Sequence, residues 1–113
     1  MASEYEDFLN ELFAPIDGVS FRRMFGGLGI FKEKTMFGLV SDDVLYFRTD
    51  DQTVPDFEAE GCGPFIYESK GKSGQMPYWR APEHLFDDAE AFADWARKSF
   101  DAALRVAKAK SRR

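Results

Sequence analysis

Residues 19–49 read VSFRRMFGGLGIFKEKTMFGLVSDDVLYFRT, and this stretch decides the fold class. Four short runs rich in Val, Ile, Phe and Tyr are separated by breaks at Gly26-Gly27, Glu33-Lys34 and Ser41-Asp42-Asp43. Runs of this kind between turn residues predict four consecutive strands of an antiparallel meander. Because side chains alternate along a strand, the last run should present Val44, Tyr46 and Arg48 on one face.

The glycines at positions 26, 27 and 29 raise the question of phosphate binding. A dinucleotide-binding loop needs a further glycine where this chain has Lys32, and a helix directly after it. The residues after Gly29 continue as a strand, so no helix N-terminus is available to hold a phosphate. The glycines are therefore expected to bend the sheet and to allow close approach of two backbones. The GKS at 71–73 also lacks the glycine and the helix of a P-loop.

Capping residues and the spacing of apolar residues predict one helix before these four strands and another after them. In residues 3–13 apolar side chains recur at helical spacing, and Ser3 with Glu6 forms a capping box. A second, short helix is predicted within residues 50–61, with Pro55 near its start.

A hairpin and a long helix are expected to complete the chain. Residues 65–69 and 75–80 should pair around turn residues 71–74. The Asp pair at 87–88 should cap a helix that runs to about residue 108. The basic tail, residues 109–113, is expected to fray.

The predicted order is α-β-β-β-β-α-β-β-α, so the fold class is α+β, with a single antiparallel sheet and helices against one face. The 113 residues suit a single domain, 1–113, ordered over about 3–108. Twelve Phe predict a core of aromatic rings. No apolar run approaches the ~20 residues of a membrane span, and the N-terminus has no signal-peptide pattern. With a single cysteine, these features indicate a cytoplasmic protein without a membrane segment.

The net charge of −5 is divided unevenly along the chain. Residues 97–113 carry seven Lys and Arg against one Asp, a net +6, which leaves −11 on residues 1–96. An acidic body repels phosphates and argues against broad nucleic-acid binding. Direct DNA binding through the basic last helix stays as an alternative, carried by Arg97, Lys98, Arg105 and Lys108.

No residues have the spacing of catalytic or metal-binding machinery. His84 is the only histidine, and no motif places a nucleophile beside it. Cys62 has no basic neighbour in sequence that would lower its pKa, so an inert thiol is expected. The Asp pairs sit at turns and helix starts, where Asp serves local structure. The sequence therefore predicts no enzyme, no cofactor and no metal, and leaves binding as the function.

Arginine and aromatic residues mark the candidate interaction surface. Alternation places Tyr78 and Arg80 on one face of their strand and Trp79 on the other. Tyr, Trp and Arg are enriched at binding hot spots. The surface expected from these residue types comprises Arg22, Arg23, Tyr78 and Arg80. A small-molecule pocket lined by aromatic rings near Trp79 stays as a further alternative.

Several motifs together resemble the N-terminal domain of the TfoX/Sxy family over residues 5–105. The MFGLV and VLYFR strands occur in the family's order. The other matching positions are the R-x-M-F-G-G core and two hairpin motifs: Arg22, Met24, Phe25, Gly26, Gly27, Phe65, Tyr67, Met76, Tyr78 and Trp79. The resemblance implies the family fold, which is similar to α+β domains of the secretion-chaperone type, some of which pair as dimers.

The family resemblance also implies a function. Full-length members are bacterial regulators of natural competence that look like co-activators of the cyclic-AMP receptor protein, and they carry a second, C-terminal helical domain. This sequence ends where that domain would begin, so a stand-alone N-terminal domain without it is expected. The resemblance therefore implies a non-enzymatic protein-interaction module in transcriptional regulation. Its implied partner is a transcription regulator such as the cyclic-AMP receptor protein, or a second copy in a homodimer.

Overall fold

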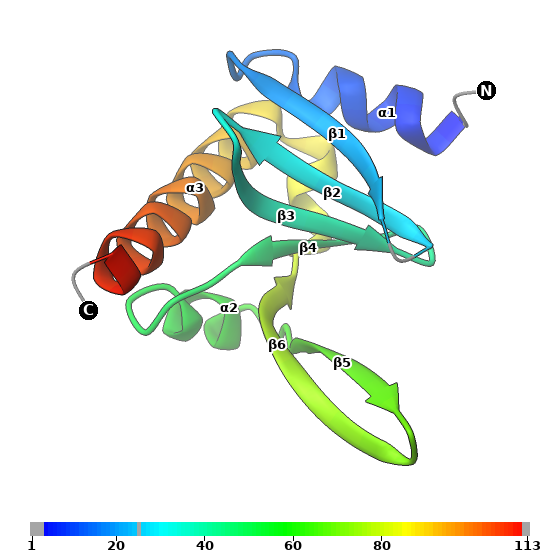
Figure 1. The fold of residues 1–113 in the computed structure, drawn as a ribbon. Coiled ribbons are helices and arrows are strands. Elements are labelled where there is room, and N and C mark those ends of the chain that lie inside the picture. The colour runs from blue at the N-terminus through cyan, green and yellow to red at the C-terminus, as the bar shows by residue number, and fades with distance from the viewer. Residues whose placement is uncertain (1–3, 25, 112–113) are drawn as a thin grey trace.

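A computed structural model describes residues 4–24 and 26–111 of the chain (Figure 1). The elements, in chain order, are α1 (Glu4–Phe13), β1 (Val19–Met24), β2 (Gly27–Lys32), β3 (Thr35–Ser41), β4 (Val44–Arg48), α2 (Val54–Ala59), β5 (Pro64–Ser69), β6 (Lys72–Arg80), the 3₁₀ helix η1 (Glu83–Asp87) and α3 (Ala89–Ser111). The predicted order of helices and strands and the α+β class are confirmed. The Ser3 capping box lies outside the described residues.

All strands belong to one six-stranded sheet with the order β1-β2-β3-β4-β6-β5, and every pair is antiparallel. The first four strands form the predicted meander. Two-residue turns at Glu33-Lys34 and Asp42-Asp43 connect β2 to β3 and β3 to β4, with φ between 50° and 71° at all four residues. Positive φ at both central residues gives the twist that matches the flanking strands.

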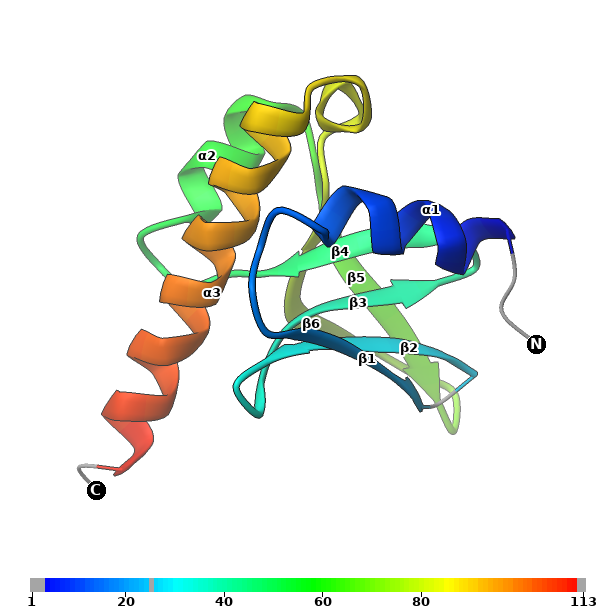
Figure 2. The same ribbon diagram turned by 90° about the horizontal axis from the view of Figure 1, so that it is seen from above.

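The helices divide the sheet into two unlike faces. Helices α1 and α3 lie on one side of the strands, which we call the helix-covered face (Figure 2). The opposite side is called the open face. The β5–β6 hairpin extends away from the body of the molecule, and α2 lies between this hairpin and α3 (Figure 1).

The core between the sheet and the helices is built of aromatic rings, as predicted. Phe13 of α1 packs edge-on against Phe37 of β3 and Phe92 of α3, with ring centroids 5.9 and 4.9 Å apart. Phe92 also contacts Phe47 of β4 at 5.7 Å. All four side chains are at most 2% exposed. Ring pairs of this kind contribute about 0.5–1.5 kcal/mol each beyond the burial of their area.

The last hairpin differs from the sequence prediction. Its turn is Lys70-Gly71, with φ of 53° and 80°, and β6 already begins at Lys72, so the predicted turn at 71–74 is wrong. Gly74 lies within the strand, where an added Cβ would stand 2.7 Å from the hydroxyl oxygen of Tyr67. The glycine therefore makes room for the Tyr67 ring across the hairpin instead of forming the turn.

The C-terminal region also contains features that the sequence did not predict. Helix η1 precedes α3, and α3 continues to Ser111, past the point where fraying was expected. Asp88 caps α3, as predicted, because its carboxylate accepts a hydrogen bond from the backbone N–H of Ala91. Within the described residues, no helix combines the length and apolar character needed to cross a membrane.

Candidate binding surfaces

The open face of the sheet carries a continuous set of apolar side chains. Register and alternation assign them, since cross-strand partners point to the same side. Contacts agree: a Cβ on Gly29 would meet Met24, Phe31 and Met36, all on this side. Tyr46 of β4 packs edge-on against Phe65 of β5 with centroids 5.0 Å apart. The larger apolar side chains of the open face are Met24, Phe31, Met36, Leu39, Tyr46, Phe65, Tyr67, Met76 and Tyr78.

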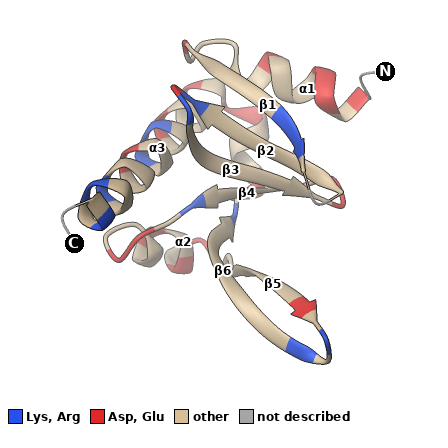
Figure 3. Cartoon of the chain, viewed as in Figure 1, with Lys and Arg blue, Asp and Glu red and all other residues tan. Residues whose placement is uncertain are grey.

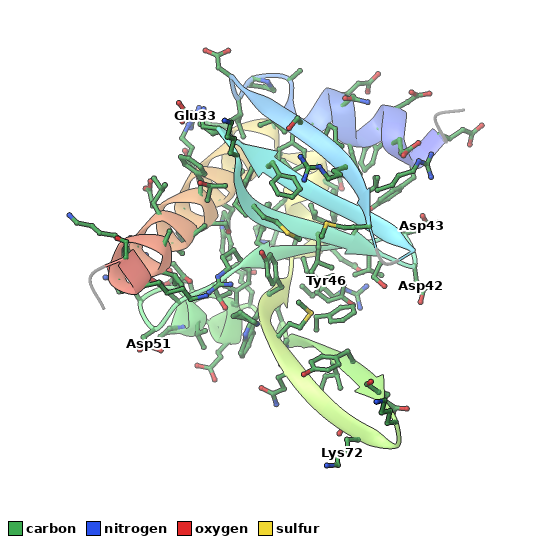
Figure 4. All side chains as sticks on the ribbon, viewed as in Figure 1. Glu33, Asp42, Asp43, Tyr46, Asp51 and Lys72 are labelled. Carbon is green, nitrogen blue, oxygen red and sulfur yellow. The ribbon has the colours of Figure 1, made fainter. Side chains whose placement is uncertain are left out.

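The charges on the open face are all positive. The guanidinium of Arg22 lies 5.0 Å from the centre of the Phe31 ring, and that of Arg48 lies 5.5 Å from the centre of the Tyr78 ring. Lys72 stands at the tip of the hairpin, and Tyr46 points from β4 toward that hairpin (Figure 4). Arg80 of β6 lies directly opposite Tyr46 of β4, so its side chain points to the same face. No acidic residue occupies a described strand position on this face.

Arg48 is incompletely paired in its position on the open face. Its Nε is buried and meets no acceptor in the part of the chain that the structure describes. Burial raises the pKa of the Tyr78 phenol, while the charge of Arg48 and a hydrogen bond from it oppose the shift. Tyr78 therefore stays a neutral ring against which the guanidinium of Arg48 lies.

A groove lies beside α1, between this helix, the β3–β4 turn and η1, and we call it the Tyr5 groove. Two adjoining cavities of about 430 and 340 Å³ share Tyr5 and Asp43. Its apolar part is a chain of rings in which Phe8 lies between Tyr5, at 6.1 Å, and Phe86 of η1, at 5.9 Å. Phe8 is 37% exposed, so this ring is accessible to a partner.

The Tyr5 groove has charges of both signs at its rim. Arg23 lies 3.3 Å from the carboxylate of Glu6, and Arg80 lies 3.5 Å from that of Glu83. Burial, and then the charge of Asp43, raise the pKa of Tyr5. Asp42 and Asp43 project at the β3–β4 turn (Figure 4). The acidic groove residues outnumber the basic ones: Glu6, Asp42, Asp43, Glu83 and Asp87 against Arg23 and Arg80.

The four residues of the expected interaction surface are divided between these two places. Arg22 and Tyr78 lie on the open face, whereas Arg23 points to the helix-covered side, where it meets Glu6 of α1. Arg80 belongs to the open face by register and also lines the Tyr5 groove. Trp79 packs on the opposite side against Phe57 of α2, in agreement with the alternation along the strand. The expected single surface is therefore two surfaces that meet at Arg80.

The basic face of α3 is largely neutralised by ion pairs. Arg97 meets Asp94 at 3.4 Å within the helix. Lys98 reaches Asp56 of α2 at 3.1 Å and lies 4.3 Å from the centre of the Trp95 ring. Of the four cations considered for DNA binding, Lys108 alone has no ion-pair partner within residues 4–24 and 26–111. A phosphate backbone would therefore have to compete with carboxylates already in place (Figure 3).

The third ion pair of α3, between Arg105 and Asp50, joins the helix to the loop before α2, and it should make stability depend on pH. Asp50→Asn is expected to lower the free energy of unfolding by about 1 kcal/mol at neutral pH, a value reduced for the partial exposure of Arg105. Arg105 donates from Nε at 2.6 Å and from Nη2 at 3.2 Å. That hydrogen bond lowers the pKa of Asp50 below its ordinary value of 3.8, although burial opposes the shift.

The stabilisation from Asp50 should be complete above its ordinary pKa and disappear as the pH falls through the lowered one. Urea unfolding at neutral pH and at successively lower pH, down through and below the ordinary pKa of 3.8, measures the difference. Asp51→Asn, at the exposed neighbouring position, is the matched control and should leave stability unchanged. A difference between the wild type and Asp50→Asn that stays constant into acid would contradict this prediction.

The two residues with the most reactive side chains, His84 and Cys62, line one pocket together with Glu60. His84 lies on the surface, with Nε2 3.0 Å from a carboxylate oxygen of Glu60. Burial, followed by the charge of Glu60, raises the pKa of the Cys62 thiol, which keeps it protonated. Nowhere in the described chain do three or more His, Cys, Asp or Glu side chains gather to hold a metal ion.

Sequence reasoning missed the Tyr5 groove and the cations' full distribution over the open face. The groove combines α1, the β3–β4 turn and η1, which no local pattern connects. A signal for Arg48 did exist, because alternation had already placed it on one face with Tyr46. The fold is that of a small α+β domain with two candidate binding surfaces.

Comparison with known proteins gives the family. Residues 11–103 match the TfoX N-terminal domain, and the chain belongs to this family. It is 39% identical over 70 residues to the DNA transformation protein TfoX1 of Aliivibrio fischeri, which covers 62% of this chain and 33% of that protein. It is 27% identical over 95 residues to Protein Sxy of Escherichia coli, covering 84% of this chain and 46% of Sxy. The matching region thus covers less than half the length of either relative, and neither name is that of an enzyme.

Proposed function

We propose that this chain is a non-catalytic protein-interaction module that regulates DNA transformation by acting on transcription in the cytoplasm. The family membership supports the link to transformation, since one relative is named for that process. The observation that carries the mechanism is the Tyr5 groove, where the accessible Phe8 ring stands among charges of both signs.

The composition of the Tyr5 groove suits a protein partner. Protein interfaces have an aromatic centre that excludes water and a polar rim that sets orientation. Phe8, flanked by Tyr5 and Phe86, provides the centre. The acidic excess at the rim fits a partner segment that is apolar with basic flanks. A transcription regulator, such as the cyclic-AMP receptor protein, is the partner we propose.

Phe8→Ala tests this function by removing the central ring of the Tyr5 groove. The variant is expected to weaken binding of the purified cyclic-AMP receptor protein at least tenfold, because an anchor of this kind contributes about 1.4 kcal/mol or more. Binding is measured by isothermal titration calorimetry. Ile66→Ala is the matched control, since Ile66 is also an exposed apolar residue, 56% accessible, but lies on the β5–β6 hairpin.

Two outcomes count against the proposed function. One is unchanged affinity of a folded Phe8→Ala protein, which would show that the groove is not the docking site. The other is equal loss in Ile66→Ala, which would place the partner on the hairpin. Circular dichroism of each variant confirms that the fold is intact before binding is compared.

A further inference from the structure

We infer that the open face of the sheet binds single-stranded nucleic acid. This inference goes beyond the proposed function and concerns a different surface from the Tyr5 groove. It rests on three observations: rings on several adjacent strands, cations placed among them, and the absence of acidic residues from the face as far as the structure describes it.

The sign of the charge distinguishes the open face from the rest of the molecule. Arg22, Arg48, Lys72 and Arg80 contribute +4 to this face, which leaves −9 on the remainder of a chain whose net charge is −5. Arg80 lies 3.5 Å from the carboxylate of Glu83 in η1, whereas Arg22, Arg48 and Lys72 form no ion pair among the described residues. Because the strand positions of the face also carry no carboxylate, these three cations present a local site for a polyanion. The negative net charge of the whole chain therefore does not apply to this face.

The positive face disfavours a second copy as the occupant. In a two-fold symmetric contact the same patch meets itself, so arginines of one copy would approach arginines of the other. Like charges brought together at an interface oppose association. A typical protein partner would also be matched by charges of both signs, as in the Tyr5 groove, whereas the open face offers one sign only.

The rings favour a single strand over a duplex. Base faces are hidden in a duplex but exposed in a single strand, where each base can stack on an aromatic side chain. Tyr67 is 45% exposed, and Phe31, Tyr46 and Phe65 are partly exposed, so four rings on β2, β4 and β5 are accessible from the same side. Helices cover the opposite side of the sheet, which leaves this face for the ligand (Figure 2).

Arginine donors are available where the phosphates would run. The side chain of Arg22 is exposed above the Phe31 ring, and the half-buried guanidinium of Arg48 lies beside the Tyr78 ring on the same face. A phosphate oxygen is a charged acceptor of the kind that a guanidinium group binds strongly. Ring and cation therefore alternate across the face, with rings for bases and guanidinium groups for the backbone.

Fluorescence anisotropy with labelled oligo(dT) of about twelve nucleotides tests the inference, since single-strand sites cover about 4–16 nucleotides. Oligo(dT) is expected to bind at about 50 mM salt, and its affinity should fall as salt rises, with a slope of about −0.7 for each phosphate neutralised. Arg22→Ala should reduce that slope by about one such step. Tyr67→Ala should weaken binding about tenfold through the loss of one stacked base.

Matched controls separate this face from the other candidates. Arg97→Ala and Lys108→Ala remove exposed cations of α3 and are expected to leave oligo(dT) affinity unchanged. Phe8→Ala, in the Tyr5 groove, should also leave it unchanged, so failure of the protein-docking proposal and failure of this one are distinguishable. Thermal unfolding of each variant shows whether the fold is intact.

Several results would overturn the inference. These are no binding of oligo(dT) at about 50 mM salt, equal or tighter binding of a duplex of the same length, or loss of binding in Lys108→Ala but not in Arg22→Ala. A dimer in sedimentation experiments that Arg22→Ala dissociates would show instead that a second copy covers the face. If Arg22→Ala no longer binds the regulator protein while Phe8→Ala still binds it, the open face is a protein-docking surface instead.

Discussion

Gly27→Ala is expected to destabilise the fold by about 3 kcal/mol or more, at the upper end of what overpacking costs. An alanine Cβ at this position would overlap the carbonyl oxygen of Val40 and lie 3.2 Å from its carbonyl carbon. Both atoms belong to the backbone of β3, so no side-chain rotation can relieve the contact. The paired strands would have to separate locally, and ladder hydrogen bonds would be lost with them.

Gly63→Ala is the control for this prediction. A Cβ at Gly63 meets no atom within 4 Å, and its φ is in the ordinary range, so the change should be neutral or slightly stabilising. Urea unfolding monitored by tryptophan fluorescence compares the two variants with the wild type. If Gly27→Ala is as stable as Gly63→Ala, the close approach of β2 and β3 is not a constraint on the fold.

Gly27 also shows which parts of the fold the sequence could predict. The meander is local: its strands have five to seven residues, two-residue turns join β2 to β3 and β3 to β4, and turn chemistry is read directly from the chain. Local patterns also correctly identified Gly27 as a site of close backbone approach, whereas a Cβ on Gly29 would meet side chains and one on Gly26 would meet nothing within 4 Å. They failed at the last hairpin, where both Gly71 and Gly74 were available to form a turn and only the packing of Tyr67 distinguishes them.

The remaining architecture depends on contacts far apart in the sequence. Strand β6 pairs with β4, although α2 and β5 lie between them in the sequence. The sheet order β4-β6-β5 therefore has no local signal. The same is true of the ion pairs that occupy Lys98 and Arg105, whose partners Asp56 and Asp50 lie 42 and 55 positions away. The basic residues of α3 were evident from the sequence, but the ion pairs that neutralise them were not.

The candidate surface contained an error that the sequence could have avoided. Arg22 and Arg23 are adjacent on one strand, and neighbouring strand residues point to opposite faces. The structure accordingly places Arg22 over Phe31 on the open face and Arg23 beside Glu6 of α1. The period-two rule that correctly separated Trp79 from Tyr78 and Arg80 applies equally to the arginine pair. The prediction of one surface relied on residue type, whereas the alternation of side chains along the strand requires two surfaces.

Phe92→Ala is expected to produce the other large effect, a loss of about 3–5 kcal/mol in the free energy of unfolding. Phe92 is fully buried, and its ring contacts Phe13 of α1, Phe47 of β4 and Phe86 of η1 at centroid distances of 4.9, 5.7 and 6.2 Å. Removing it leaves a cavity among rings held by three different elements, which cannot all move inward together. For a small domain whose total stability is about 5–15 kcal/mol, such a loss populates the unfolded state.

Phe8→Ala is the matched comparison, because it removes the same atoms from a ring that is 37% exposed. Its expected cost is about 1 kcal/mol, within the usual range for single substitutions, since solvent already covers part of the ring and no closed cavity forms. Urea unfolding gives both values, and calorimetric thermal unfolding gives the accompanying shift in Tm. Equal losses in the two variants would mean that Phe92 does not hold α1, the sheet and α3 together. The expected inequality is also what permits Phe8→Ala to serve as a binding test, because the groove ring can be removed while the core that positions it stays folded.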